Sequence, residues 1–146
     1  MKLVLLTTLS TLSILLTQFD PSSLVSGRPT DPDPTLFAAT CDQSVRLTPT
    51  AAGNAINADG NARKRADARG NQDFRVEINP TVPKGTVFDV LVDGTLVGTM
   101  SVKARRARLV LTTDNGSLPA SLDPVCSAVQ VDVTTTSGTV ILSGTF

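Results

Sequence analysis

Hydrophobic and polar residues alternate with a period of two through most of the chain after residue 37. The clearest run is FRVEI at residues 74–78, where every second position is apolar. Because successive side chains of a β-strand point to opposite faces, this run predicts a strand with one buried face. No segment shows a sustained helical period with caps, although the Ala- and Asn-rich residues 49–58 would allow a short helical turn. The pattern therefore predicts an all-β domain.

The best hairpin signal is Asp93-Gly94, which lies between the apolar runs 87–92 and 95–102. Asp-Gly favours the two positive-φ positions of a type I′ turn. Further alternating runs, separated by turn residues, extend to the last residue. We therefore expect a two-sheet antiparallel sandwich, immunoglobulin-like or related, of about seven or eight strands. Its expected core consists of alternating apolar residues: Val76, Ile78, Phe88, Val90, Leu109, Leu111, Val131 and Val133.

Residues 1–27 have the pattern of a secretory signal peptide. A positive start, Met1-Lys2, precedes an uncharged apolar run that is shorter than the roughly 20 residues needed to span a bilayer. Small residues at Ser26 and Gly27 suit a cleavage point. Residues 28–36 are rich in proline and predict a flexible linker, followed by a single domain over residues 37–146. We expect a secreted or cell-surface protein, periplasmic or extracellular, with no membrane span in its mature chain.

The two cysteines, Cys41 and Cys126, predict a disulfide if the chain is exported. A loop of that length stabilises a fold by about 4 kcal/mol in the chain-entropy account. The alternative is a lipoprotein anchor at Cys41. The preceding residues 37–40 (FAAT) lack the leucine and small-residue spacing of such a signal, so the disulfide is favoured.

Missing residue types exclude several kinds of chemistry. The chain has no His, Trp or Tyr. Without His there is no Ser-His-Asp or Cys-His catalytic pair and no His metal ligand. Without Trp and Tyr there is no strong stacking surface for sugars or bases. We therefore expect no catalytic residue, no cofactor and no metal.

A short calcium-loop signal does not change this expectation. Residues 57–61 (NADGN) have oxygen-bearing residues before a glycine, as in the core of such a loop. In that register the first and last ligand positions would be Ala55 and Ala66, which cannot bind the ion. A plain turn is the favoured interpretation.

Charge is balanced over the whole chain but clustered locally. There are 13 basic and 13 acidic residues, and removing Lys2 and Asp20 with the leader leaves 12 of each. If neighbouring strands carried the two basic clusters, they would form one patch for phosphate, nucleic acid or an anionic surface. Solvated strand faces that oppose aggregation are the favoured alternative, because net charge is zero and no aromatics interleave. The clusters are Arg63, Lys64, Arg65 with Arg69, and Lys103, Arg105, Arg106, Arg108.

Two carboxylates occupy matching places in two predicted hairpins. Asp89 and Asp132 each lie one residue from an apolar strand position. Paired carboxylates can act on a glycosidic bond. Each Asp alternates with core positions, however, so we expect both on the solvent face, without a catalytic role.

Three motifs resemble a recurring β-rich module of exported bacterial proteins. They are the strand FRVEI (74–78), the turn PKGT (83–86) and the hairpin start VLVDG (90–94), with GTF at residues 144–146. The likeness covers roughly residues 59–146. The chain departs from the pattern at Lys64, where such modules tend to have an aromatic, and at Arg105-Arg106, where they are Gly-rich. The resemblance implies the fold and export, and such modules mostly lack an assigned activity.

These observations predict an exported, non-catalytic module with a structural or binding role at the cell surface or outside the cell. One alternative is a polyanion-binding module that uses the two basic clusters. A second and weaker alternative is a small Asp-based hydrolase. The expected partner is an extracellular protein or a polyanion, with no strong signal for nucleic acid.

Overall fold

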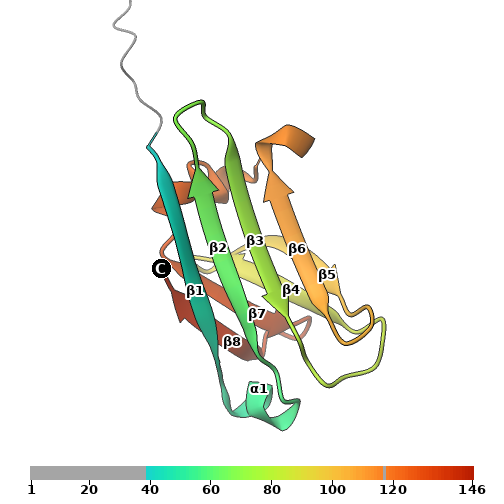
Figure 1. Cartoon of the computed structure of the whole chain (residues 1–146). Coiled ribbons are helices and arrows are strands. Elements are labelled where there is room, and N and C mark those ends of the chain that lie inside the picture. Colours follow the sequence, from blue (N-terminus) through green and yellow to red (C-terminus); the bar gives the residue numbers. More distant parts are fainter. Residues whose placement is uncertain (1–38, 117) are drawn as a thin grey trace, which may run out of the picture. The chain divides into compact units, whose positions relative to one another are not determined.

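The computed structural model describes residues 39–116 and 118–146, all within the compact unit Thr35–Phe146. The predicted leader (residues 1–27) and linker (residues 28–36) lie outside the described residues. Strands dominate the described part, together with one short helix and three 3-10 turns (Figure 1). None of the helices in this part is long and apolar enough to cross a membrane.

Most strands end at a turn or loop that contains Gly, Pro, Asn or Asp, which are the residues that break strand pairing; the turn between β5 and β6 is the exception. The strands are β1 (Cys41–Pro49), β2 (Gly60–Ala66), β3 (Gln72–Ile78), β4 (Val87–Val92), β5 (Thr95–Ser101), β6 (Ala107–Thr112), β7 (Gln130–Thr135) and β8 (Val140–Thr145). The helical elements are α1 (Ala51–Ala55), η1 (Thr113–Asn115), η2 (Ala120–Leu122) and η3 (Val125–Ser127).

The eight strands are antiparallel and form one nearly closed sheet, in the order β5-β4-β7-β8-β1-β2-β3-β6. β1 joins the two halves of this order. Its first seven residues pair with β2, whereas Thr48 and Pro49 pair with Ser143 and Leu142 of β8. The predicted all-β class is confirmed, and so is the number of strands. The predicted division into two sheets is not established, because hydrogen bonding continues from one half to the other through β1.

The order of strands combines hairpins with three crossovers, from β3 to β4, from β5 to β6 and from β6 to β7. β1, β2 and β3 form a meander, and the chain then crosses to the hairpin β4-β5. From β5 the chain crosses back to β6, which pairs with β3, and after β6 it crosses again to β7, which pairs with β4 and β8. The predicted hairpin turn is confirmed, with φ of 49° at Asp93 and 79° at Gly94. β6 pairs with β3 although two strands separate them along the chain.

The core follows the alternation read from the sequence, with additions from the crossover between β6 and β7. Six of the eight expected core residues are fully buried, and Leu109 and Leu111 are partly exposed because β6 is an edge strand. Leu122 and Val125, in η2 and η3, are also fully buried. The crossover therefore contributes to the core although it contains no strand.

The short helix α1 packs closely on β8. Thr50 caps it, because its Oγ1 accepts a hydrogen bond from the Gly53 N–H (3.2 Å) and donates one to the Val140 carbonyl (2.7 Å). Gly53 is buried against β8, and a Cβ at this position would lie 2.0 Å from the carbonyl oxygen of Ile141. The contact is with backbone, which cannot move aside without disturbing β8.

The substitution Gly53→Ala should lower the free energy of unfolding by about 1–3 kcal/mol, because the added methyl overpacks the contact between α1 and β8. Urea unfolding of the disulfide-bonded protein measures the effect. Asn54→Ala is the matched control, since Asn54 is exposed in the same helix. Equal stability of the two variants would contradict the close approach.

Candidate functional site

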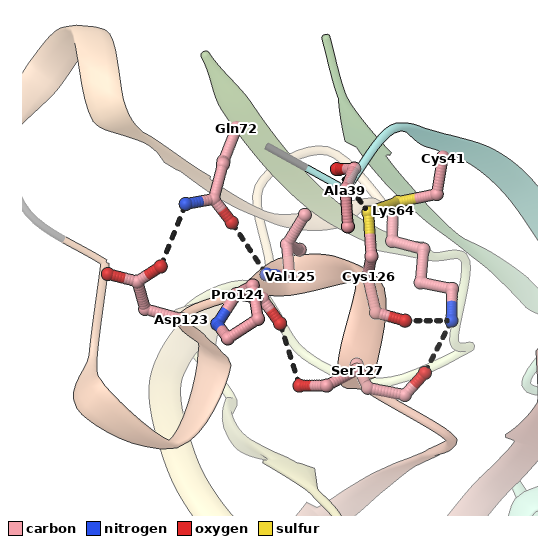
Figure 2. Close-up of a disulfide and its surroundings, with 10 residues drawn as sticks. Ala39, Cys41, Lys64, Gln72, Asp123, Pro124, Val125, Cys126 and Ser127 are labelled. Carbon is pink, nitrogen blue, oxygen red and sulfur yellow. Dashed lines mark hydrogen bonds between the residues drawn. A yellow bond between two sulfur atoms is a disulfide. The ribbon is translucent and has the colours of Figure 1, made fainter. Parts of the chain in front are cut away.

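The predicted disulfide is confirmed: Cys41, at the start of β1, is bonded to Cys126 in η3 (Figure 2). Their Cα atoms lie 5.7 Å apart, and 85 residues separate them along the chain. No free cysteine occurs in the part of the chain that the structure describes. The bond ties the crossover between β6 and β7 to the first strand, so the cysteines act as a structural link.

Lys64 lies inside the protein and not with the surface arginines on either side of it. Its side chain follows the inward face of β2 between Ala62 and Ala66, and the residue is only 5% exposed. Nζ donates hydrogen bonds to the carbonyls of Cys126 (3.2 Å) and Ala128 (2.5 Å), as Figure 2 shows. Grouping Lys64 with a basic surface patch was therefore wrong. The period of two on a strand places it opposite its neighbours.

Phe146 covers the other side of the Lys64 ammonium. Nζ lies 4.8 Å from the centroid of the Phe146 ring, a distance suited to a cation–π interaction. That ring also meets the Phe74 ring edge-on, with centroids 6.4 Å apart. The ammonium is thus enclosed by two carbonyls and an aromatic face, which accounts for its burial without a carboxylate partner.

The Asp93 carboxylate binds the C-terminal end of the segment, residues 126–130, whose N-terminal carbonyls bind Lys64. The Asp93 carboxylate, in the turn between β4 and β5, accepts hydrogen bonds from the N–H groups of Val129 (3.2 Å) and Gln130 (2.8 Å). The peptide groups of residues 126–130 therefore have an ammonium on their carbonyls and a carboxylate on their amides. We call this arrangement the crossover clamp. It fixes where β7 begins.

Gln72 supports the clamp one turn earlier in the crossover. Its Oε1 accepts a hydrogen bond from the Val125 N–H (2.6 Å), and its Nε2 donates to Asp123 (2.8 Å).

Burial lowers the pKa of the Lys64 ammonium from its ordinary value, while attraction to Asp93 opposes this shift. Sequence reasoning missed the roles of Gln72 and Asp93, because both depend on where the crossover passes.

The first basic cluster is divided between two faces of β2. Arg63 and Arg65 point outward, opposite Lys64. Arg63 makes a bidentate ion pair with Asp42 on β1, with distances of 2.9 and 2.7 Å. This hydrogen-bonded pairing with Arg63 holds the pKa of Asp42 below its ordinary value. The positive charge of Arg63 is therefore compensated by the neighbouring strand.

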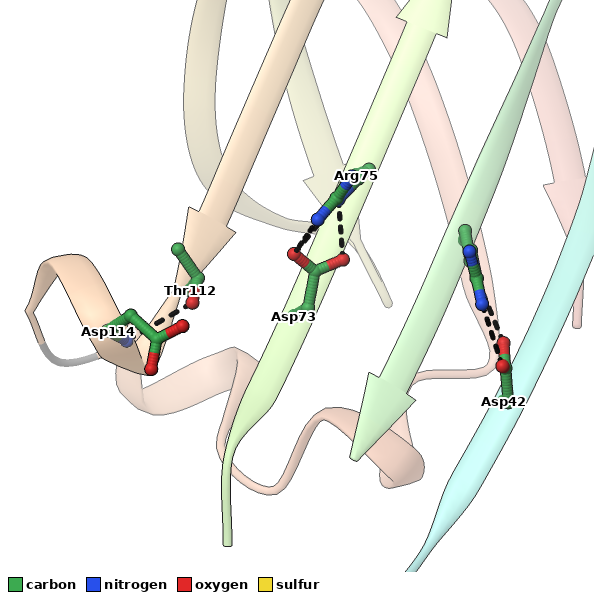
Figure 3. A network of polar contacts seen from close by, with 6 residues as sticks. Asp42, Asp73, Arg75, Thr112 and Asp114 are labelled. Carbon is green, nitrogen blue, oxygen red and sulfur yellow. Dashed lines mark hydrogen bonds and ion pairs between the residues drawn. The ribbon is translucent and has the colours of Figure 1, made fainter. Parts of the chain in front are cut away.

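A second bidentate pair lies on the adjacent strand β3. Arg75 binds the carboxylate of Asp73 through Nε (2.7 Å) and Nη2 (2.8 Å), as Figure 3 shows. In the sheet register Asp73 also lies directly opposite Arg65 of β2. The outer face of β1, β2 and β3 thus carries charges of both signs in alternation. It resembles a solvated sheet face more than an anion-binding patch.

The second basic cluster remains concentrated. Lys103, Arg106 and Arg108 line a surface hollow of about 430 Å³ beside β5 and β6, which we call the basic hollow. Thr99, Met100 and Ser101 of β5 complete its lining. Arg105 is exposed at the tip of the turn between these strands.

The two clusters do not meet. β3 lies between β2 and β6 in the sheet, and its Glu77 is directly opposite Arg108. Glu77 also forms an ion pair with Arg106 at 3.3 Å. The carboxylates of β3 therefore separate the arginines of β2 from the basic hollow.

The two candidate catalytic carboxylates lie on one face of adjacent strands. Asp89 pairs with Thr134, and Asp132 pairs with Leu91, so the two acids are diagonal neighbours on β4 and β7. Asp132 accepts a hydrogen bond from Gln130 (2.8 Å). Neither acid lines the basic hollow.

The calcium-like residues 57–61 form the turn that leads from α1 into β2. Asn57 there has a positive φ of 46°. No group of three or more His, Cys, Asp or Glu side chains is arranged to hold a metal ion anywhere in the described residues. The segment is a turn, as the sequence predicts.

Comparisons with known proteins gave no relative. No family model, no curated protein and no solved structure matches this chain. Any function must therefore be argued from the chemistry of its own surface.

We expect thiol labelling of the unreduced, denatured protein to find no reactive cysteine. Replacing both Cys41 and Cys126 with Ser should lower the free energy of unfolding by about 4 kcal/mol, because the unfolded chain regains the freedom of a long loop. Chemical denaturation measures the loss, and the wild type treated with reductant is the control. A labelled thiol in the wild type would contradict the bond.

Lys64 should make stability depend on pH in a defined direction. Its pKa is lower in the folded than in the unfolded protein, where it is close to the ordinary value of 10.5. Between these two values the unfolded state binds more protons, so the free energy of unfolding should rise with pH. Lys64→Met should lose this rise. Lys84→Met, at an exposed position, should keep it. Denaturation series from pH 7 to 10 compare the slopes, and equal slopes would contradict the burial of the ammonium.

Proposed function

We propose that this chain is an exported, non-catalytic module that acts by binding an anionic partner at the cell surface or outside the cell. Its signal-peptide pattern, its disulfide and its missing histidine support this proposal. The likeness to the β-rich modules of exported bacterial proteins is part of the same proposal. We also propose that the strands pack as two layers, with β1-β2-β3-β6 against β8-β7-β4-β5.

One observation carries the choice of an anionic partner. The chain has no net charge, yet three cations gather around the basic hollow with a single carboxylate, Glu77, paired to one of them. Elsewhere on this side of the sheet, at Arg63 and Arg75, the arginines are neutralised by bidentate pairs. Uncompensated cations beside a recess attract anions, and the attraction weakens as salt screens it.

The purified protein should be retained on immobilised heparin and on phosphocellulose at low salt, and it should elute as salt rises. Arg105→Glu with Arg106→Glu should abolish retention, because it reverses one charge in the lining of the basic hollow and one at the tip of the adjoining turn. Arg63→Glu with Arg65→Glu, which reverses the same number of charges on β2, should retain most of it. Salt-gradient elution measures the difference.

Two results would contradict the proposal. Failure of the wild type to bind either matrix at low salt would remove the anionic partner. Turnover of a hydrolase substrate that is lost in Asp89→Ala would contradict the non-catalytic part, since that change removes one of the paired carboxylates.

A further inference from the structure

The sheet is left open between its two edge strands, β5 and β6. The two strands are close there, since a Cβ at Gly98 of β5 would lie 3.0 Å from the Leu109 side chain of β6. The basic hollow lies beside this seam. Backbone donors of the edge strand can therefore reach a ligand that the side chains of the hollow hold.

The direction of the β5 backbone groups supports contact between the edge strand and a ligand in the hollow. The Val102 N–H donates to the Thr86 carbonyl (2.9 Å), which lies at the start of the neighbouring strand β4. Backbone groups of alternate residues point to opposite sides of a strand, so the N–H groups of Thr99 and Ser101 point toward β6. β6 forms no ladder with β5. Thr99 and Ser101 both line the hollow, so their backbone N–H groups and hydroxyls are donors available at its wall.

The turn that shapes the hollow is strained. Lys103 and Arg106 exchange both backbone hydrogen bonds, at 2.7 and 3.0 Å. Between them Ala104 and Arg105 have φ of 50° and 67°, in the left-handed region that favours glycine. Residues with a Cβ persist there when their surroundings hold them, and such residues cluster at functional sites. The turn sets Lys103 and Arg106 opposite each other in the backbone, and both residues line the hollow.

We propose that the basic hollow binds the sulfate or phosphate ester groups of an anionic polysaccharide; this inference rests on the proposed function. Guanidinium forks of Arg106 and Arg108 match the paired oxygens of a tetrahedral oxyanion. The Lys103 ammonium adds a third positive charge, and the β5 hydroxyls and N–H groups supply neutral donors. The volume of about 430 Å³ falls within the range of small-ligand sites.

Within the described residues no aromatic ring is free for stacking, which disfavours a single-stranded nucleic acid and equally any sugar that is held by stacking. Single-stranded nucleic acids are bound largely by stacking bases on aromatic side chains. In the described residues Phe74 and Phe88 are buried, and Phe146 packs against Phe74 and Lys64. Recognition therefore depends on charged groups, which a sulfated or phosphorylated glycan presents along its length.

The test measures affinity for dextran sulfate, dextran phosphate and plain dextran across a salt series. Arg106→Ala with Arg108→Ala should weaken binding at least about tenfold and should reduce the slope of log affinity against log salt by about two. Arg46→Ala with Arg65→Ala is the charge-matched control, since both residues are exposed on β1 and β2, and it should change affinity less than about threefold. Unfolding curves check that each variant is folded.

A further variant separates the hollow from the tip of the turn. Ala104→Asn with Arg105→Gly supplies a preferred type I′ pair and removes only the tip charge, so affinity should stay within about threefold of the wild type. A loss equal to that of Arg106→Ala with Arg108→Ala would place the site at the tip and overturn the inference. An equal loss in the control pair would show that binding depends on general charge, which also overturns it.

The outcomes distinguish this inference from the proposed function. If the wild type binds dextran sulfate and the hollow variant binds it equally well, the inference fails and the proposed function stands. If the wild type binds no anionic polymer, the proposed function fails. Tighter binding to the sulfated or the phosphorylated dextran identifies the ester. Tighter binding to single-stranded DNA than to either dextran at the same salt overturns the assignment to a polysaccharide.

Discussion

Burying the ammonium of Lys64 costs free energy, and the carbonyls of Cys126 and Ala128 offset this cost by accepting its hydrogen bonds. The same two carbonyls belong to the segment whose amides bind the Asp93 carboxylate. A cation from β2 and an anion from the β4-β5 turn therefore hold one stretch of backbone. Because β7 begins there, its register against β4 and β8 follows from this pair of charges. The disulfide adds a covalent link at the same place.

The charged residues of this chain are divided between the interior and the surface. Lys64 is buried and positions a crossover. Of the outward arginines of β2 and β3, Arg63 pairs with Asp42 of β1 and Arg75 pairs with Asp73 of its own strand. Four further cations, Lys103, Arg105, Arg106 and Arg108, gather on the β5-β6 turn and the start of β6. A chain with no net charge can in this way still have a strongly cationic corner. Local placement, and not composition, determines the surface that a partner meets.

The alternation of apolar residues was enough to predict the all-β class, most of the core and the hairpin turn at Asp93-Gly94. Those features depend on residues near one another in the sequence. The pairing of β6 with β3 was not predictable, since it depends on a crossover that skips β4 and β5. For the same reason Glu77 could not be placed beside Arg106 and Arg108.

Lys64 shows a different limit of sequence reasoning. Its position in the alternation pointed inward, between Ala62 and Ala66, but its chemical type and its arginine neighbours pointed outward. The pattern was the better guide. What made burial acceptable was a pair of carbonyls far along the chain, and no local signal reveals them. The basic hollow likewise depends on a seam between strands, which composition does not reveal.

β1 makes its last two pairs with β8, so the first strand is completed only by the last one. Phe146, beyond β8, also supplies the ring that covers the Lys64 ammonium. Contacts between such distant segments form slowly, because long loops must close before they are made. During synthesis, a nascent chain that lacks β8 cannot close its sheet. The domain therefore completes its fold only once β8 is available, and a chaperone that binds it earlier meets an open sheet.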